Sequence, residues 1–234
     1  QLGIDPKGSL KVHLSYKAIG DVFGQGETVL EALAHYMRDG LLVLPSHTWA
    51  HVNEKNPVMD MLHCPSNVGA LTEVFRKWPG ALRSAHPTHS VAALGRDAEA
   101  FVAGEETLQT PCGKGGCYYK LWEREAQILL IGVNFARNTF IHGIEEWDGA
   151  VGSISPNASD LYVITPDARR LYTPQYRHCA SIGSETFPKL EPEAYAKGIL
   201  RFGNFGNATA RVMDTVPLRS FVAEKLKENP RHLL

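Results

Sequence analysis

The sequence lacks the features that mark several large classes of protein. Its 24 Lys and Arg residues balance 25 Asp and Glu residues, and a net charge of -1 argues against a strongly basic nucleic-acid-binding protein. No apolar run approaches the roughly 18 residues of a membrane-spanning helix, so we expect no membrane partner. The four cysteines are too few and too scattered for a disulfide framework. We therefore expect reduced thiols in a cytoplasmic protein.

Internal repeats, low-complexity tracts and recognisable linkers are also missing. The 234 residues, 44% of them hydrophobic, can bury one sizeable core. We therefore predict a single domain over residues 1–234. The first residues, 1–5, show no signal-peptide pattern and no initiating Met, so we expect the numbering to start inside a longer coding sequence.

Short apolar runs alternate with segments of helical periodicity. We predict strands over 11–14, 41–45, 90–94 and 128–133, and helices around 29–37, 66–78 (with Ser66 as N-cap), 96–102, 120–126 and 138–146. Further on, we predict a β-hairpin over 160–173, helices around 193–200 and 217–227, and a strand near 209–213. This order favours an α/β fold, a layered α/β/α sandwich around a mixed sheet with an additional β-hairpin excursion.

Histidines gather where the predicted strands end, and strand-end loops are where α/β folds form sites. They are His13, His47, His51, His86, His89 and His142. His47 and His51 have the i, i+4 spacing of a zinc pair, to which His63 or Cys64 could add a ligand. The glutamate of an HExxH motif is missing, however, and no two cysteines have CxxC spacing. We predict no metal and keep a metallohydrolase as a rival hypothesis.

One helical segment carries a histidine and two carboxylates. Because residues three and four apart share a helix face, either Glu145 or Glu146 can lie beside His142. A neighbouring carboxylate favours the protonated imidazole and fixes its tautomer, which suits a general base. A surface His–Glu pair is the alternative reading.

Two loops invite comparison with anion-binding motifs. The polar stretch 83–90 offers Arg83, hydroxyl groups and backbone N–H groups to an anionic ligand, although an ordinary turn has the same composition. The Gly-rich stretch 110–116 lacks the Gly-Lys-Ser/Thr ending of a Walker A loop, which disfavours hydrolysis of a nucleoside triphosphate.

In their order, these segments resemble the aminoglycoside 3-N-acetyltransferase family, also called the antibiotic N-acetyltransferase family. The likeness lies in stretches 12–33, 41–49, 65–95, 110–121, 128–146 and 206–222, and its most specific part is RSxHPxHSxAAxG followed by GVxxxxNTxxHxxE. The resemblance implies a non-GNAT α/β fold. It also implies a small-molecule partner and a reaction in which acetyl-CoA acetylates the 3-amino group of 2-deoxystreptamine aminoglycosides, which confers antibiotic resistance.

The resemblance also assigns residues. His142 would be the general base in a direct transfer, and Glu145 would orient it. The residues expected to line the CoA side are Ser15, Arg83, Ser84, Pro87, Thr88, His89, Ser90 and Gly113. Loop N–H groups or the hydroxyls of Thr48 and Ser84 would stabilise the oxyanion. A ping-pong route through an acetylated Cys64 or Cys112 is the alternative.

The acceptor is less defined than the donor. An aminoglycoside carries several positive charges, and because the net charge is near zero we expect an acidic cleft rather than a global field. The substrate-binding candidates are Thr48, Glu54, Asp60, Glu146, Asp148 and Glu185. The loop over residues 50–64 departs most from relatives, so a different amine acceptor stays open, as does a catalytically silent binding protein.

Overall fold

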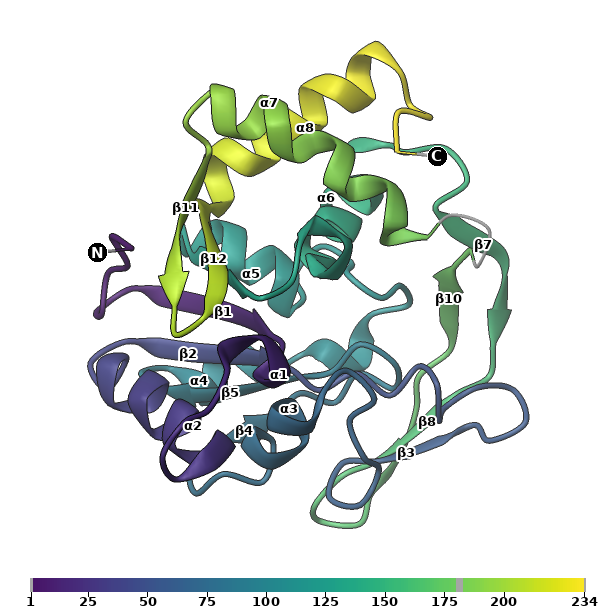
Figure 1. Cartoon of the computed structure of the whole chain (residues 1–234). Helices are drawn as coiled ribbons and strands as arrows, with labels where there is room; N and C mark the ends of the chain where they lie inside the picture. The colour runs from purple at the N-terminus through teal and green to yellow at the C-terminus, as the bar shows by residue number, and fades with distance from the viewer. Residues whose placement is uncertain (1, 180–182, 234) are drawn as a thin grey trace.

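A seven-stranded mixed sheet forms the centre of the molecule. The computed structural model describes residues 2–179 and 183–233, and Figure 1 traces the chain through it. The sheet consists of β1 (Ser9–Leu14), β2 (Leu41–Pro45), β4 (Leu82–Arg83), β5 (Val91–Gly95), β6 (Gln127–Ile131), β11 (Leu200–Phe205) and β12 (Ala208–Asp214). Their spatial order is β11-β12-β6-β1-β2-β5-β4.

The strand directions in this sheet define where a site can form. β1 lies between β2 and β6 and runs parallel to both, whereas the remaining pairs are antiparallel. The carboxyl ends of β1, β2 and β6 therefore meet at one edge of the sheet. In open α/β sheets this edge, beside the point where strand order reverses, is where ligands bind.

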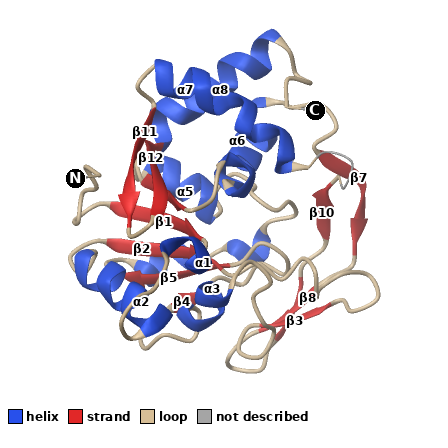
Figure 2. Cartoon of the chain, in the orientation of Figure 1, coloured by secondary structure: helices blue, strands red, loops and turns tan. Residues whose placement is uncertain are grey.

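Helices cover both faces of the sheet and make three layers (Figures 1 and 2). The helices are α1 (Tyr16–Ile19), α2 (Gln25–Tyr36), α3 (Ala70–Phe75), α4 (Ala98–Val102), α5 (Cys117–Glu123), α6 (Thr139–Asp148), α7 (Glu191–Ala196) and α8 (Thr215–Glu228), with 3-10 turns at Glu105–Thr107, Phe135–Arg137 and Ser184–Leu190. None of the described helices has the length and apolarity to cross a membrane.

Strand periodicity explains the two hydrophobic layers. Leu42 and Leu44 of β2 pack with the buried faces of α2 and α3, while Leu41 and Val43 pack with α5, α6 and α8. Successive strand residues point to opposite faces, so each strand supplies both layers. The expectation of a layered α/β fold around a mixed sheet is confirmed in this form.

Two small sheets flank the central one. β3 (Val58–Asp60), β8 (Tyr162–Ile164) and β9 (Arg170–Tyr172) form one, and β7 (Ile154–Ser159) and β10 (Gln175–His178) form the other. β8 and β9 pair antiparallel within the segment predicted as a hairpin, but β8 also pairs in parallel with β3. The segment 50–64, expected to be a loop, therefore contains a short strand, β3.

The start of α3 also differs from the prediction. The helix begins at Ala70 after Gly69, and Ser66 lies in the preceding turn. There the Ser66 hydroxyl bonds the Thr72 hydroxyl over 3.0 Å, and its backbone N–H donates to Glu73 over 2.7 Å. The polar groups that made Ser66 resemble an N-cap thus bond side chains of α3 rather than its first backbone N–H groups.

Candidate active site

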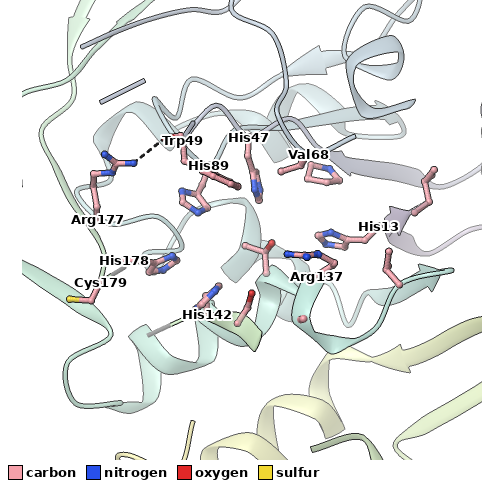
Figure 3. Close-up of a pocket in the computed structure, with 17 residues that line it drawn as sticks. His13, His47, Trp49, Val68, His89, Arg137, His142, Arg177, His178 and Cys179 are labelled. Atoms are coloured by element: carbon pink, nitrogen blue, oxygen red, sulfur yellow. Dashed lines mark hydrogen bonds between the residues drawn. The ribbon is translucent and has the colours of Figure 1, made fainter. Parts of the chain in front are cut away.

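A cavity of about 560 Å³ opens at the carboxyl edge of β1, β2 and β6 (Figure 3). His13 belongs to β1 and His47 follows β2, so both reach the cavity directly from the sheet. His142 comes from α6 and His178 from the last residue of β10. His89, in the loop before β5, completes the ring of imidazoles that Figure 3 shows facing one another.

The shortest histidine–carboxylate contact at this cavity joins His142, which lines it, to Glu145 behind it. Asn138, the N-cap residue, precedes α6, and the i, i+3 spacing then places both side chains on one face. His142 Nδ1 lies 2.7 Å from Glu145 Oε2. The Glu145 side chain is 1% exposed and that of His142 is 14% exposed. A buried carboxylate thus fixes the ring while Nε2 is left for a ligand, which is the geometry of a general base.

A second histidine–carboxylate pair lies beside the first. His178 Nε2 is 2.8 Å from Glu146 Oε1, and the His178 ring stacks on the His142 ring with centroids 4.3 Å apart. Burial raises the pKa of Glu146 to about 7, although the nearby Thr110 hydroxyl and the N–H of Cys112 oppose this rise. Both glutamates weighed from the sequence therefore pair with a histidine, but with different ones.

The other cavity histidines are held neutral. Burial lowers the pKa of His13, His47, His89 and His178 well below the usual range, and neighbouring charges add to the effect. His47 Nε2 also bonds the Tyr118 hydroxyl over 2.7 Å. Neutral imidazoles can donate or accept hydrogen bonds without repelling a cationic ligand.

The expected CoA-binding role of Arg83 is not supported. Its side chain is buried below the sheet edge rather than in the cavity. The guanidinium donates to the carbonyl oxygens of Ser46, Met61 and Cys64 over 2.7–3.1 Å and to the hydroxyl of Ser90. These bonds join two loops to the sheet and use four of the five guanidinium N–H groups.

Most of the same loop is also structural. Ser84 donates to Glu105 and accepts from the Val91 N–H, and the hydroxyl of Thr48 donates to the carbonyl of Pro87. The residues buried away from the cavity lining are Thr48, Ser84, Pro87, Thr88 and Ser90. Of the loop, His89 alone lines the cavity, so the hydroxyls of Thr48 and Ser84 are not placed to stabilise an oxyanion there.

Ser15 and Gly113 also lie outside the cavity lining. Ser15 is half-buried next to Leu14, which does line the cavity, and its N–H donates to the carbonyl of Ile131. Gly113 lies in the turn before α5. Neither residue has a position or contact that indicates a ligand-binding role.

The expected acidic cleft is not found, since no Asp or Glu lines the cavity within the described residues. Glu54 accepts from Ser159, Asp60 pairs with His63, and Asp148 pairs with Arg219 on the side facing α8. Glu185 is exposed and lies 3.5 Å from Arg137 at the cavity rim. Of the buried substrate-binding candidates, Glu146 is the one that stands directly behind a lining residue, His178.

The structure supports neither a zinc pair at His47 and His51 nor a nucleophilic role for Cys64 or Cys112. His51 is exposed and separated from His47, which is buried against Tyr118. Burial raises the pKa of the Cys112 and Cys117 thiols well above the usual range, and also raises that of Cys64. A protonated thiol is a poor nucleophile, so the ping-pong route through Cys64 or Cys112 lacks support.

Several lining residues were not identified from the sequence. They are Trp49, Arg137, Thr139, Arg177 and His178. Arg177 and His178 come from β10, a strand without clear periodicity, and Arg177 donates to the carbonyl of Trp49 over 3.1 Å. The sequence carried a signal for Trp49 alone, which is an aromatic residue two positions after His47, a predicted site residue.

Comparison with known proteins identifies the family of the chain. The model of the family described as aminoglycoside 3-N-acetyltransferase matches residues 12–227, and the chain belongs to this family of acetyltransferases. An aminoglycoside N(3')-acetyltransferase-like protein, YokD from Bacillus subtilis (strain 168), is 24% identical over 96% of this chain and 87% of its own length. Aminoglycoside N(3)-acetyltransferase VII from Streptomyces paromomycinus is 25% identical, covering 97% and 88%.

Solved structures share the fold. Aminoglycoside acetyltransferase AAC(3)-Xa superposes with a TM-score of 0.87 at 24% identity, over 99% of this chain and 90% of that one. AAC-IIIb in its binary complex with CoASH superposes with a TM-score of 0.84 at 22% identity, covering 97% and 90%. AAC(3)-IVa superposes with a TM-score of 0.82 at 25% identity, covering 100% and 87%.

Proposed function

We propose that this protein transfers the acetyl group of acetyl-CoA directly to the 3-amino group of a 2-deoxystreptamine aminoglycoside, with His142 as general base. The His142–Glu145 pair in an open cavity is the observation that carries the proposal. Family membership supports the reaction class. A CoA-bound structure of AAC-IIIb and aminoglycoside-bound structures of other similar proteins support the two substrates.

The proposed step begins after the acceptor ammonium has lost one proton to solvent. The free amine attacks the thioester carbonyl, and His142 Nε2 takes the second proton as the C–N bond forms. The C–S bond then breaks, and the imidazolium returns this proton to the leaving CoA thiolate. Glu145 stabilises the transient cation through Nδ1, 2.7 Å away. General-base catalysis of this kind contributes roughly 100- to 10,000-fold.

We assign oxyanion stabilisation to Thr139. Its side chain lines the cavity at the first residue of α6, one turn before His142. The positive end of the helix dipole favours negative charge at this position. The hydroxyl and the helix terminus together replace the Thr48 and Ser84 hydroxyls, which are already hydrogen-bonded in the interior.

We place the donor along the side of the cavity formed by Leu14, Val133 and Arg137. Leu14 and Val133 offer an apolar wall to the pantetheine arm. Arg137 is exposed and also lines a neighbouring cavity of about 480 Å³, together with Asn134 and Asn207. A guanidinium and two amides suit the phosphate groups of CoA better than the buried Arg83.

Acetyl-CoA turnover distinguishes this function from transfer to another amine. We expect release of free CoA thiol with gentamicin, sisomicin or apramycin, and none above background with spermidine or putrescine. The neutral imidazoles can accept hydrogen bonds from the amino groups of a rigid aminoglycoside. A flexible polyamine loses more conformational entropy on binding, so we expect it to bind weakly. Turnover with the polyamines alone would favour the alternative acceptor, and acetyl-CoA binding without any turnover would favour a silent binding protein.

A further inference from the structure

A cluster of metal-ligating groups adjoins the proposed catalytic pair without being part of it. It consists of Cys112, Glu146 and His178, from the loop before α5, from α6 and from β10. One ligand atom from each lies within 4.8 Å of the other two. The proposed proton transfer uses none of these three groups, although His178 also faces the acceptor in the cavity.

The hydrogen bonds within this cluster leave one buried carboxylate oxygen without a partner. Glu146 Oε1 contacts His178 Nε2 over 2.8 Å and accepts from the Cys112 N–H over 2.9 Å. The other oxygen, Oε2, is buried without a hydrogen-bond partner of normal geometry, and the Glu146 side chain is 5% exposed. An unpaired buried carboxylate oxygen costs free energy, and a bound cation would remove that cost.

We propose that Cys112 Sγ, a Glu146 carboxylate oxygen and His178 Nε2 bind one zinc ion. Thiolate, carboxylate and imidazole are zinc's three protein ligand types, and the mixed set disfavours magnesium and calcium, which prefer oxygen alone. Binding releases the Cys112 thiol proton and the proton shared between His178 and Glu146 to solvent. This assignment departs from the expectation of a metal-free site.

The position of this site gives zinc an effect on catalysis. His178 lines the cavity and its ring stacks on His142, with centroids 4.3 Å apart. Because two protons leave as Zn²⁺ binds, the net charge of the cluster does not change. Zinc instead holds the His178 ring in place, so that the stacked His142 ring is less free to reorient between the amine and the leaving thiolate, and kcat falls while acetyl-CoA binding is largely unchanged. This consequence rests on the proposed function, whereas the metal site itself does not.

Metal binding is tested without any activity measurement. Titration of the whole chain with Co²⁺ should give one equivalent and a thiolate-to-cobalt charge-transfer band in the near ultraviolet, and zinc should displace it. Cys112→Ser should abolish the band and weaken zinc binding by at least about 100-fold in calorimetry. Glu146→Gln should weaken zinc binding while keeping the band, because the thiolate ligand remains. This second variant tests the site even if Cys112→Ser fails to fold.

Cys179→Ser is the matched control, because Cys179 lines the same cavity next to His178 but lies outside the cluster. A band that is lost in Cys179→Ser and kept in Cys112→Ser would overturn the assignment, as would wild-type protein that gives no band. If the band behaves as expected but zinc leaves kcat unchanged, the metal site stands and its proposed effect on catalysis is refuted.

Discussion

Replacing His142 by alanine should lower kcat by roughly 100- to 10,000-fold while changing acetyl-CoA binding little. A buried carboxylate, Glu145, holds His142 through Nδ1 at 2.7 Å and leaves Nε2 for the amine, whereas the Nε2 of His178 is bonded to Glu146. Without it, the amine must lose its proton to water as it attacks. Steady-state kinetics with saturating aminoglycoside, together with calorimetric titration of acetyl-CoA, measure both quantities.

Two controls separate a lost base from a damaged fold. His35→Ala removes an exposed histidine from the last turn of α2, far from the cavity, and should leave kcat unchanged. Added imidazole should restore part of the activity of His142→Ala, because the truncation leaves space at the cavity wall. A His142→Ala variant that keeps near-wild-type kcat would show that another group accepts the proton.

Lys11→Met should stabilise the fold by about 2–5 kcal/mol at pH 6, the largest stability change we expect from one substitution. Lys11 lies fully buried in the central strand β1, and Nζ has no hydrogen-bond partner among the described residues. Its ammonium lies 5.2 Å from the centre of the Tyr118 ring. Burial lowers the pKa of Lys11 from 10.5 to about 7. Methionine fills a similar volume without a charge to desolvate.

The sign of the pH dependence follows from this shift. Between about pH 7 and 10.5 the unfolded chain keeps a proton on Lys11 that the folded protein releases, so wild-type stability rises with pH across this window. The advantage of Lys11→Met should therefore be full below pH 7 and shrink toward pH 10. Denaturant midpoints at pH 6 and pH 9 measure it. Lys17→Met, at an exposed position in α1, is the control expected to change stability little; an equal gain in both variants would refute the burial argument.

The sequence predicted best those elements whose signal is local. The apolar run 41–45 became β2 with the predicted bounds, and 128–133 became most of β6. The i, i+3 spacing of His142 and Glu145 predicted their contact because one helix fixes it. Such features depend on periodicity within a single element, which the sequence carries directly.

Features that depend on contacts between distant segments were predicted poorly. Arg83 resembles an anion ligand in the sequence, but its carbonyl acceptors belong to residues 19 to 37 positions away. His178 reaches His142 because β10 pairs with β7, and the alternation in neither strand is clear. The predicted acidic substrate-binding cleft is absent for the same reason, because Asp148 and Glu54 bond residues 71 and 105 positions away in the described part of the chain. Burial and long-range pairing, not residue type, decide these roles.

The most direct test of the account compares two aminoglycosides that differ only at the 3-amino group, one free and one acetylated beforehand. Free CoA thiol released from acetyl-CoA by the wild-type protein is the quantity to follow, with His142→Ala as the second arm. The account predicts release with the free amine alone, and loss of this release in His142→Ala. Equal release with both compounds would contradict the assignment of the 3-amino group, and release that persists in the variant would contradict His142 as the base.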